Sequence, residues 1–422
     1  MMMLHDFCGL DFGTSNSTIG VFNKHNNISM VPLEQGKPIL RSAIFFDYER
    51  GGCLFGQQGV NEYLLGTHGR LMVSLKSILG SSLMQEKTLI HNSLVSYTDI
   101  LGTLIRYIKL QAEKKLGYEL SKVVLGRPVR FHDYDDKRDL LAENTLREVA
   151  LKQGFKTVLF QFEPIAAALT YEQTITKEQL ALIVDLGGGT SDFSVIRLRP
   201  DVGGKDRFED VLANKGIHIG GTDFDRKFNL QSVMPELGLG GEMRGISGNI
   251  QIPSSYYHDL TTWHTINSLY THQTQRALKS IWNVAEQKNR IERLMNVIKR
   301  QQGHKILNEI EQGKCLLSQA EQISLDLTFI ENNFMLNVER ARFQEIIHDK
   351  VEQLVETLLD TVKEAGVSNE VIDSIFFTGG STQIPMIRQA VAKHFPTAAI
   401  IQGDVFSSVG RGLIIDAIRK FS

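Results

Sequence analysis

The sequence has few cysteines, and their spacing supports no cross-linked framework. Its 422 residues include three, Cys8, Cys53 and Cys315, which lie far apart and form no CxxC pair. This spacing argues against a disulfide scaffold and a cysteine-based zinc site. Dispersed thiols suit a reducing compartment, so we expect a cytoplasmic protein.

Long apolar runs and a large net charge are also missing. No apolar stretch approaches the roughly 18 to 20 residues that span a bilayer, and the segment Met1–Asp6 has no basic residue, which argues against a signal peptide. The formal net charge is −2. Composition therefore gives no reason to expect a membrane or a nucleic acid as a partner.

Two common catalytic signatures are absent as well. The sequence contains neither the GxxxxGK(S/T) loop of P-loop nucleotidases nor the HExxH pair of zinc proteases. What it does contain is a folded protein's composition, with 42% hydrophobic and 22% charged residues. Because 422 residues exceed what one core usually supports, we expect two lobes.

A glycine-rich segment at Leu182–Ile196 carries the strongest local signal. An apolar strand ends in Asp185, three glycines follow, and Asp192 opens a return strand. Glycines allow a phosphate chain to approach the backbone, whose N–H groups can form an anion nest, and carboxylates can hold a magnesium ion. This stretch by itself fits either a phosphate-binding hairpin or an ordinary glycine-rich hairpin with a polar tip.

A second copy of the pattern lies 174 residues earlier, at Leu10–Phe22. The aligned pairs are Asp11 with Asp185, Gly13 with Gly187, Asn16 with Thr190, Ser17 with Ser191, and Val21 with Val195. A constant offset that preserves the acid, the glycine, the hydroxyl and the return strand indicates an internal duplication. Two such hairpins could clasp one polyphosphate from both sides.

The chain alternates helices and strands between Asp99 and Leu169, which predicts a parallel sheet with crossover helices. We also expect short helices at Val60–Leu65 and Leu71–Leu79. Residues 237–248 contain five glycines and predict a flexible insertion. Ile266–Lys299 has a long polar helical pattern.

Five elements, taken in order, resemble the actin-like ATPases and, more narrowly, the heat shock protein 70 (DnaK) chaperones. They are Asp11–Asn16 (DFGTSN), Glu163–Ala167 (EPIAA), Asp185–Asp192 (DLGGGTSD), Gly220–Asp225 (GGTDFD) and Thr378–Pro385 (TGGSTQIP). The resemblance implies a two-lobed α/β fold of duplicated ribonuclease-H-like domains with nucleotide in the cleft. Lobe I would comprise residues 1–174 plus 400–422, and lobe II residues 175–399 with a helical insertion at about 237–305.

The resemblance also implies a phosphate site that binds ATP or ADP with Mg²⁺, and that allows K⁺ beside it. Lys76 would be the catalytic lysine, while Pro128 and Glu163 would relay the nucleotide state between lobes. Thr190 and Asp192 would lie beside the γ-phosphate and the attacking water. The phosphate-binding residues would be Gly13, Thr14, Ser15, Gly187, Gly188 and Gly189, and the metal-side carboxylates Asp11 and Asp185.

The nucleoside side of the site is implied in the same way. Its residues would be Gly220, Gly221, Glu311, Lys314, Ser318, Gly379, Gly380, Ser381 and Asp404. Three positions depart from the family pattern: Cys315 and Gln383 replace arginines on the adenine side, and Thr222 replaces a glutamate. Losing a planar cation that stacks on adenine predicts weaker or altered nucleotide affinity.

The resemblance favours an ATPase of the DnaK type, with an unidentified protein partner or client. The sequence reaches Ser422 without the family's linker and peptide-binding domain, so it is similar to truncated members such as the bacterial YegD proteins. A nucleotide-gated binding module with negligible hydrolysis remains an alternative. A sugar-kinase-type phosphotransferase or an actin-like filament former fits the hairpins but not the other motifs.

Overall fold

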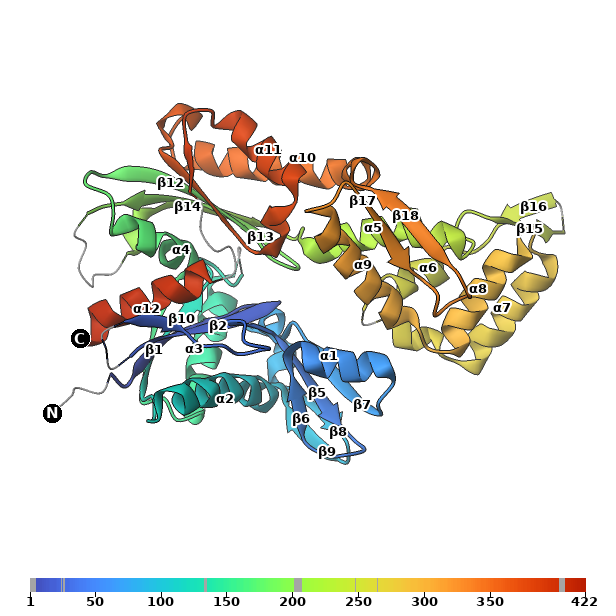
Figure 1. Cartoon of the computed structure of the whole chain (residues 1–422), viewed down its shortest axis with the longest axis horizontal. Coiled ribbons are helices and arrows are strands. Elements are labelled where there is room, and N and C mark those ends of the chain that lie inside the picture. Colours follow the sequence, from blue (N-terminus) through green and yellow to red (C-terminus); the bar gives the residue numbers. More distant parts are fainter. Residues whose placement is uncertain are drawn as a thin grey trace. The chain divides into compact units, whose positions relative to one another are not determined.

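The computed structural model describes residues 5–23, 25, 27–132, 135–200, 207–246, 248–263, 265–401 and 407–422. The chain forms two compact units. Unit 1 comprises residues 1–218, 355–382 and 390–422, and unit 2 comprises residues 219–354 and 383–389. Figure 1 gives the labels of the helices and strands.

Unit 1 contains two large sheets that share one topology. The first sheet runs β11-β10-β1-β2-β3, with β4 also paired to β2, and the second runs β20-β19-β12-β13-β14. In each sheet an antiparallel hairpin, β1–β2 or β12–β13, continues into two parallel strands on one side and an antiparallel strand on the other. The duplication predicted from sequence is therefore confirmed at the level of whole sheets.

The strands of the first sheet are β1 (Phe7–Phe12), β2 (Asn16–Phe22), β3 (Ile28–Met30), β4 (Ile39–Arg41), β10 (Lys122–Arg127) and β11 (Thr157–Phe162). Those of the second are β12 (Gln179–Leu186), β13 (Ser191–Leu198), β14 (Val211–Ile217), β19 (Ser374–Thr378) and β20 (Ala399–Ile401). The parallel strands in both sheets agree with the expected α/β class.

Helices α4 and α12 lie between the two sheets (Figure 1). Ile165, Ala168 and Leu169 of α4 (Glu163–Glu172) share a core with the second sheet, and α12 (Ser408–Phe421) packs on the first. Glycines allow very close contact here. A Cβ added at Gly412 would lie 1.8 Å from the carbonyl oxygen of Ala166, and one added at Gly9 would lie 2.2 Å from the backbone nitrogen of Ile414.

Other described elements of unit 1 are helices and short antiparallel strands. They are α1 (Gly56–Leu65), α2 (Tyr97–Leu116), α3 (Asp136–Lys152), the sheet β6-β5-β7 (Cys53–Phe55, Ala43–Asp47, Gly69–Val73) and the hairpin β8–β9 (Lys87–Ile90, Ser93–Ser96). Helices α10 (Arg340–Glu364) and α11 (Pro385–His394) each have residues in both units.

Unit 2 is mainly helical, with two small hairpins. It contains α5 (Gly221–Glu236), α6 (Ser255–Leu260), α7 (His272–Val284), α8 (Lys288–Lys299), α9 (Gly303–Leu317) and the hairpins β15–β16 (Glu242–Gly245, Gly248–Gln251) and β17–β18 (Gln322–Asp326, Met335–Glu339). Among the described residues of both units, no helix is long and apolar enough to cross a membrane.

Three local predictions were wrong. Residues 71–79 are not one helix, because Leu71 to Val73 continue β7 in register with β5, and only Leu75–Ile78 form a single 3₁₀ turn. The pattern over Ile266–Lys299 is divided into a 3₁₀ turn and two helices, since Thr271 caps the start of α7 and Ala285 is extended. Part of the predicted flexible insertion forms the hairpin β15–β16.

Candidate functional site

The two duplicated hairpins present their acids at equivalent register positions. Asp11 is the second-to-last residue of β1 and pairs with Thr18, while Asp185 is the second-to-last residue of β12 and pairs with Asp192. Each carboxylate therefore stands where its strand enters the polar turn. Thr190 is exposed in the second turn, and Asp192 is half-buried at the start of β13.

The tips of the hairpins touch each other. A Cβ added at Gly188 would lie 2.2 Å from the Oγ of Ser15, so only glycine fits without a shift of the serine. The second tip is closed by the N–H of Gly187, which donates to the Thr190 carbonyl at 2.9 Å. Gly13 is restricted in the same way, because its Cβ would lie 2.1 Å from the carbonyl oxygen of Asn16. Thr14 lies in the first tip, and a Cβ added at Gly189 would meet open space.

Ser42 braces the first tip, a role that the sequence analysis missed. Its hydroxyl donates to the Gly13 carbonyl at 2.8 Å and lies 2.9 Å from the hydroxyl of Ser17. Its backbone N–H donates to the Ser15 carbonyl at 2.8 Å. Ser42 is buried between β4 and β5. No motif marks this residue, so only the folded chain reveals it.

Lys76 and Glu163 form a buried ion pair. The Lys76 Nζ lies 2.6 Å from the Glu163 Oε1, and the two side chains are only 9% and 13% exposed. Lys76 comes from the 3₁₀ turn at Leu75–Ile78, and Glu163 is the first residue of α4. The fold thus joins two predicted site residues from separate parts of unit 1.

The pair interacts electrostatically with both hairpin acids. Burial raises the pKa of Asp11 to about 8, and the Glu163 carboxylate adds to this effect while Lys76 opposes it. Burial and Glu163 also raise the pKa of Asp185 to about 6, although a hydrogen bond from Thr378 opposes the rise. Burial lowers the pKa of Lys76, but Glu163 and Asp11 more than offset it, so the ammonium is retained.

This donor set fits a magnesium ion. Three carboxylates face a single ammonium, and the raised pKa values of Asp11 and Asp185 reflect that excess of negative charge. No cluster of three or more His, Cys, Asp and Glu side chains with metal-ligand geometry occurs among the described residues. Mg²⁺ does not need one, since it is usually bound by one or two carboxylates together with water and substrate phosphates.

The segment after β19 packs directly on the second hairpin. Gly379 has φ +78°, and a Cβ there would lie 2.3 Å from the Leu186 carbonyl oxygen and 2.9 Å from the Asp185 Oδ1. The Ser381 hydroxyl donates to the Gly187 carbonyl at 3.3 Å. Gly380 begins the 3₁₀ turn that contains Ser381. Gly379 and Ser381 therefore contact the second hairpin, and Gly380 lies between them.

The other nucleoside-side residues belong to unit 2. The N–H of Gly220 donates to Asp223 at 2.9 Å at the start of α5. The Lys314 ammonium donates to the Gly221 carbonyl at 3.1 Å and to Asp225 at 2.7 Å. The Ser318 hydroxyl donates to the Lys314 carbonyl at 3.3 Å, at the end of α9.

Three predicted residues remain, namely Glu311, Asp404 and Pro128. Glu311 is half-buried on α9, one turn before the exposed Cys315. Asp404 lies outside the described residues. Pro128 follows β10, and its carbonyl accepts a hydrogen bond from the Nε of Arg127 at 3.0 Å.

Comparisons with known proteins identify the family of the chain. The family model described as "Hsp70 protein" matches residues 7–233 and 279–405, which is most of the chain. The chain is also 26% identical over 394 residues to a protein named "Chaperone protein DnaK" from Ureaplasma urealyticum, covering 91% of this chain and 53% of the relative. It therefore spans about half the length of that relative. Because the family model matches most of the chain, including both duplicated hairpins and the segment after β19, the chain belongs to the Hsp70 family and has the actin-like nucleotide-binding fold of that family.

Proposed function

We propose that this protein binds ATP with Mg²⁺ and hydrolyses it to ADP and phosphate. The observation that supports the proposal best is the buried Lys76–Glu163 pair beside Asp11 and Asp185, at the base of two hairpins whose tips touch. Phosphoryl transfer depends mainly on positioning and on neutralising the charge of the transferred group. The cluster of Lys76, Glu163, Asp11 and Asp185 would supply both positioning and charge neutralisation.

Different residues of unit 1 would bind the phosphates, hold the magnesium ion and stabilise the transferred group. The backbone N–H groups around Gly13, Ser15 and Gly188 would hold the phosphates, and Asp11 and Asp185 would hold the magnesium ion through water. Bound magnesium would supply charge neutralisation on the phosphate oxygens. The Lys76 ammonium, kept protonated by its carboxylate neighbours, would stabilise charge on the transferred phosphoryl group.

Water activation would fall to the second hairpin. Asp192 and Thr190 stand on either side of Ser191 at the turn, and Asp192 is directly opposite Asp185. From there the two side chains could orient a water molecule for attack on the γ-phosphate. Glu163 would position Lys76 through their 2.6 Å contact.

Each large sheet would define one lobe of the family fold. Lobe I would contain residues 1–174 plus 400–422, and lobe II residues 175–399. The compact units divide the chain differently because α4 and α12 pack the two large sheets into one unit. The nucleoside would contact Glu311, Lys314 and Ser318 on α9, and Asp404.

A nucleotide-gated binding module with negligible hydrolysis is the second candidate. Cys315 favours it, because this exposed thiol stands where the family pattern has an arginine that stacks on adenine. In either case we expect an unidentified protein partner or client, a cytoplasmic location, and no role for nucleic acid.

Steady-state phosphate release with Mg-ATP separates these candidates. We expect turnover in the unmodified protein and a loss of at least about a hundredfold in Lys76→Ala and Asp192→Asn, comparable to the loss of one oxyanion-stabilising group. ATP binding measured by calorimetry without any turnover would favour the binding module. Turnover unaffected by both substitutions would place the chemistry elsewhere.

Neighbouring glycines provide a matched test of the phosphate site. A Cβ at Gly188 is accommodated only if the Ser15 hydroxyl rotates away, whereas a Cβ at Gly189 faces open space. If phosphates approach the backbone here, Gly189→Ala should leave thermal unfolding of the free protein unchanged and still weaken ATP binding. Unchanged ATP affinity in Gly189→Ala would contradict that approach.

A further inference from the structure

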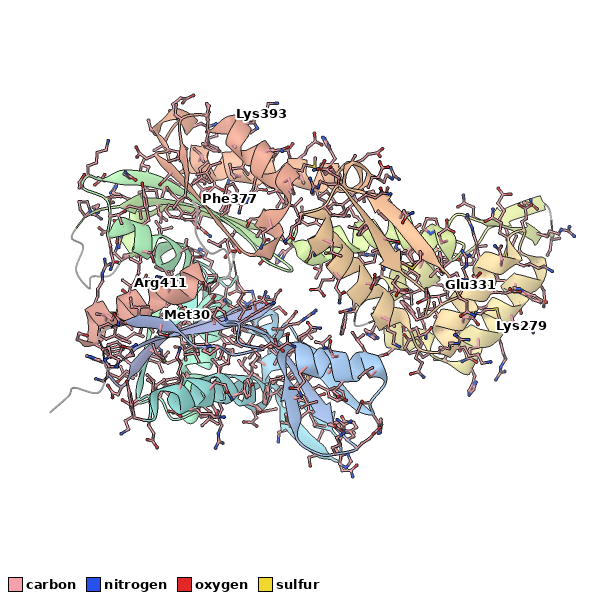
Figure 2. The ribbon with its side chains drawn as sticks, viewed as in Figure 1. Met30, Lys279, Glu331, Phe377, Lys393 and Arg411 are labelled. Carbon is pink, nitrogen blue, oxygen red and sulfur yellow. The ribbon has the colours of Figure 1, made fainter. Side chains whose placement is uncertain are left out.

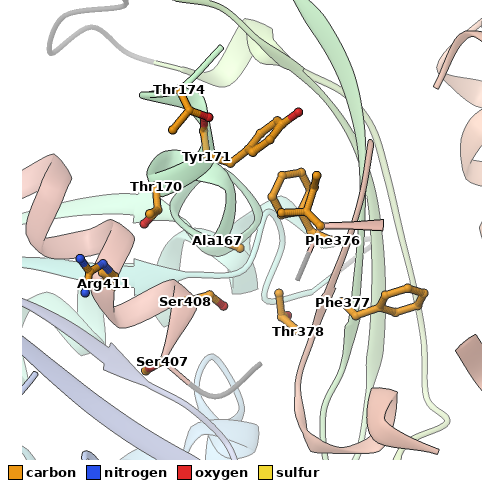
Figure 3. Close-up of a pocket in the computed structure, with 11 residues that line it drawn as sticks. Ala167, Thr170, Tyr171, Thr174, Phe376, Phe377, Thr378, Ser407, Ser408 and Arg411 are labelled. Atoms are coloured by element: carbon orange, nitrogen blue, oxygen red, sulfur yellow. The ribbon is translucent and has the colours of Figure 1, made fainter. Parts of the chain in front are cut away.

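A cavity that opens to solvent lies in unit 1. It has a volume of about 300 Å³ and is bordered by α4, β19 and α12 (Figure 3). This volume is at the lower end of the range that holds small organic ligands. The described residues that line it are Ala167, Thr170, Tyr171, Thr174, Phe376, Phe377, Thr378, Ile401, Ser407, Ser408 and Arg411.

The cavity is separate from the proposed nucleotide site. None of the hairpin-tip residues lines it, and Lys76 and Glu163 do not either. Two parts of the structure nevertheless connect the cavity with the proposed nucleotide site. Thr378 lines the cavity and also hydrogen-bonds Asp185. Ala167 and Thr170 follow Glu163 at helical spacing along one face of α4, and Thr174 lies just beyond the end of this helix.

One wall of the cavity is aromatic. The rings of Tyr171 and Phe376 lie edge to face with centroids 5.4 Å apart, and Figure 3 shows Phe376 directed toward Tyr171. The Tyr171 hydroxyl is already used, since it donates to Gln179 at 3.1 Å. The wall therefore offers mainly apolar ring surface, which suits a flat hydrophobic group.

The α12 end of the cavity favours an anion. Arg411 extends from the first turns of α12, and the Ser408 Oγ is buried without a hydrogen-bond partner among the described residues (Figures 2 and 3). The N–H of Arg411 closes the first helical turn on the Ser407 carbonyl at 2.8 Å, so the N-terminus of this 14-residue helix borders the cavity. None of the described lining residues is acidic.

We propose that this cavity binds a small aromatic carboxylate. The ring would pack against Tyr171 and Phe376, and the carboxylate would accept hydrogen bonds from Arg411 and Ser408. Arginine is well suited to this task because its planar guanidinium can bind a carboxylate through two parallel hydrogen bonds. The ligand is identified by chemical class and not by a particular metabolite.

Occupancy of the cavity should change ATP turnover, a consequence that rests on the proposed function. A ligand that contacts Thr378 and α4 would act on the groups that hold Asp185 and Glu163. Binding itself does not depend on hydrolysis, so the two ideas can fail separately.

Calorimetry with indole-3-acetate and its uncharged amide, indole-3-acetamide, tests the proposal. We expect one indole-3-acetate per chain, and binding of the amide weaker by about tenfold or more, because a charge-assisted contact is lost. Arg411→Ala should weaken indole-3-acetate binding by a similar factor. Arg106→Ala is the matched control, since Arg106 is an exposed arginine on α2 that does not line the cavity.

A variant that fills the cavity tests whether the ligand binds there. Thr170→Phe should block the cavity and abolish binding, and thermal unfolding confirms that each variant is folded. Equal affinity for the acid and the amide would overturn the proposal, as would no binding at millimolar concentration or full binding by folded Arg411→Ala. Binding without any ATP turnover would leave the cavity assignment intact and contradict only the proposed hydrolysis.

Discussion

Replacing Lys76 by methionine tests the charge balance of the site, because methionine keeps much of the side chain's length and removes only the cation. The Lys76 Nζ lies 2.6 Å from the Glu163 Oε1, and both side chains are almost fully buried. At this distance the attraction is about 6 kcal/mol for an effective dielectric constant of about 20, before the cost of desolvation. Breaking a buried pair on one side typically costs about 3–5 kcal/mol.

The opposite substitution should cost much less. In Glu163→Gln the ammonium still interacts with Asp11 and Asp185, so the buried cation keeps opposite charges nearby. We expect a loss of about 1 kcal/mol in the free energy of unfolding, against about 3–5 kcal/mol for Lys76→Met. The double variant should be more stable than Lys76→Met, because it has one fewer unpaired carboxylate.

Urea unfolding of the nucleotide-free protein, followed by circular dichroism, measures all four members of this cycle. Additive effects of the two substitutions would refute the reasoning, since they would mean that the pair is not coupled. So would a smaller loss for Lys76→Met than for Glu163→Gln. Magnesium and nucleotide are left out, so that ligand binding does not mask the intrinsic stability.

Three further expectations concern other parts of the chain. Burial lowers the pKa of His304 below its ordinary 6.5, so the side chain takes up a proton when the protein unfolds at lower pH. The free energy of unfolding should therefore fall as the pH drops below about 6.5. In thermal melts, His304→Phe should flatten that pH dependence. Iodoacetamide should modify the exposed Cys315 in the native protein, whereas the buried Cys8, whose pKa is raised by burial, should react only after denaturation, as mass spectrometry would show. Gly412→Ala should cost at least about 3 kcal/mol, because its Cβ would overlap the Ala166 carbonyl, and a melting temperature within a degree of the unmodified protein would contradict that contact.

Local sequence patterns were enough to predict much of the fold. The two hairpins could be predicted because acid, glycine and return strand lie within about a dozen residues of one another. The contact of Lys76 with Glu163 joins residues 87 positions apart. No periodicity links them, so that part of the site came only from the family resemblance.

The structure of other segments depends on tertiary contacts that local patterns do not show. Leu71 has helical neighbours in sequence, but its pairing with Phe45 makes it part of a strand. Ser42 looks like an ordinary loop serine, and its role depends on two carbonyls of a distant hairpin. The structure at these residues depends on which strand or hairpin packs beside them. The residues next to them in the sequence do not reveal that partner.

The close contact of α12 with β1 has a consequence for the order of events during synthesis. The backbone of Gly9 lies against Ile414, so β1 is covered by a helix that follows it by about 400 residues in the sequence. Loop closure over nearly the whole described chain must precede this contact, which makes it intrinsically slow to form. During synthesis the first sheet should thus lack this cover, with one face of β1 exposed, until residues 408–421 have emerged from the ribosome.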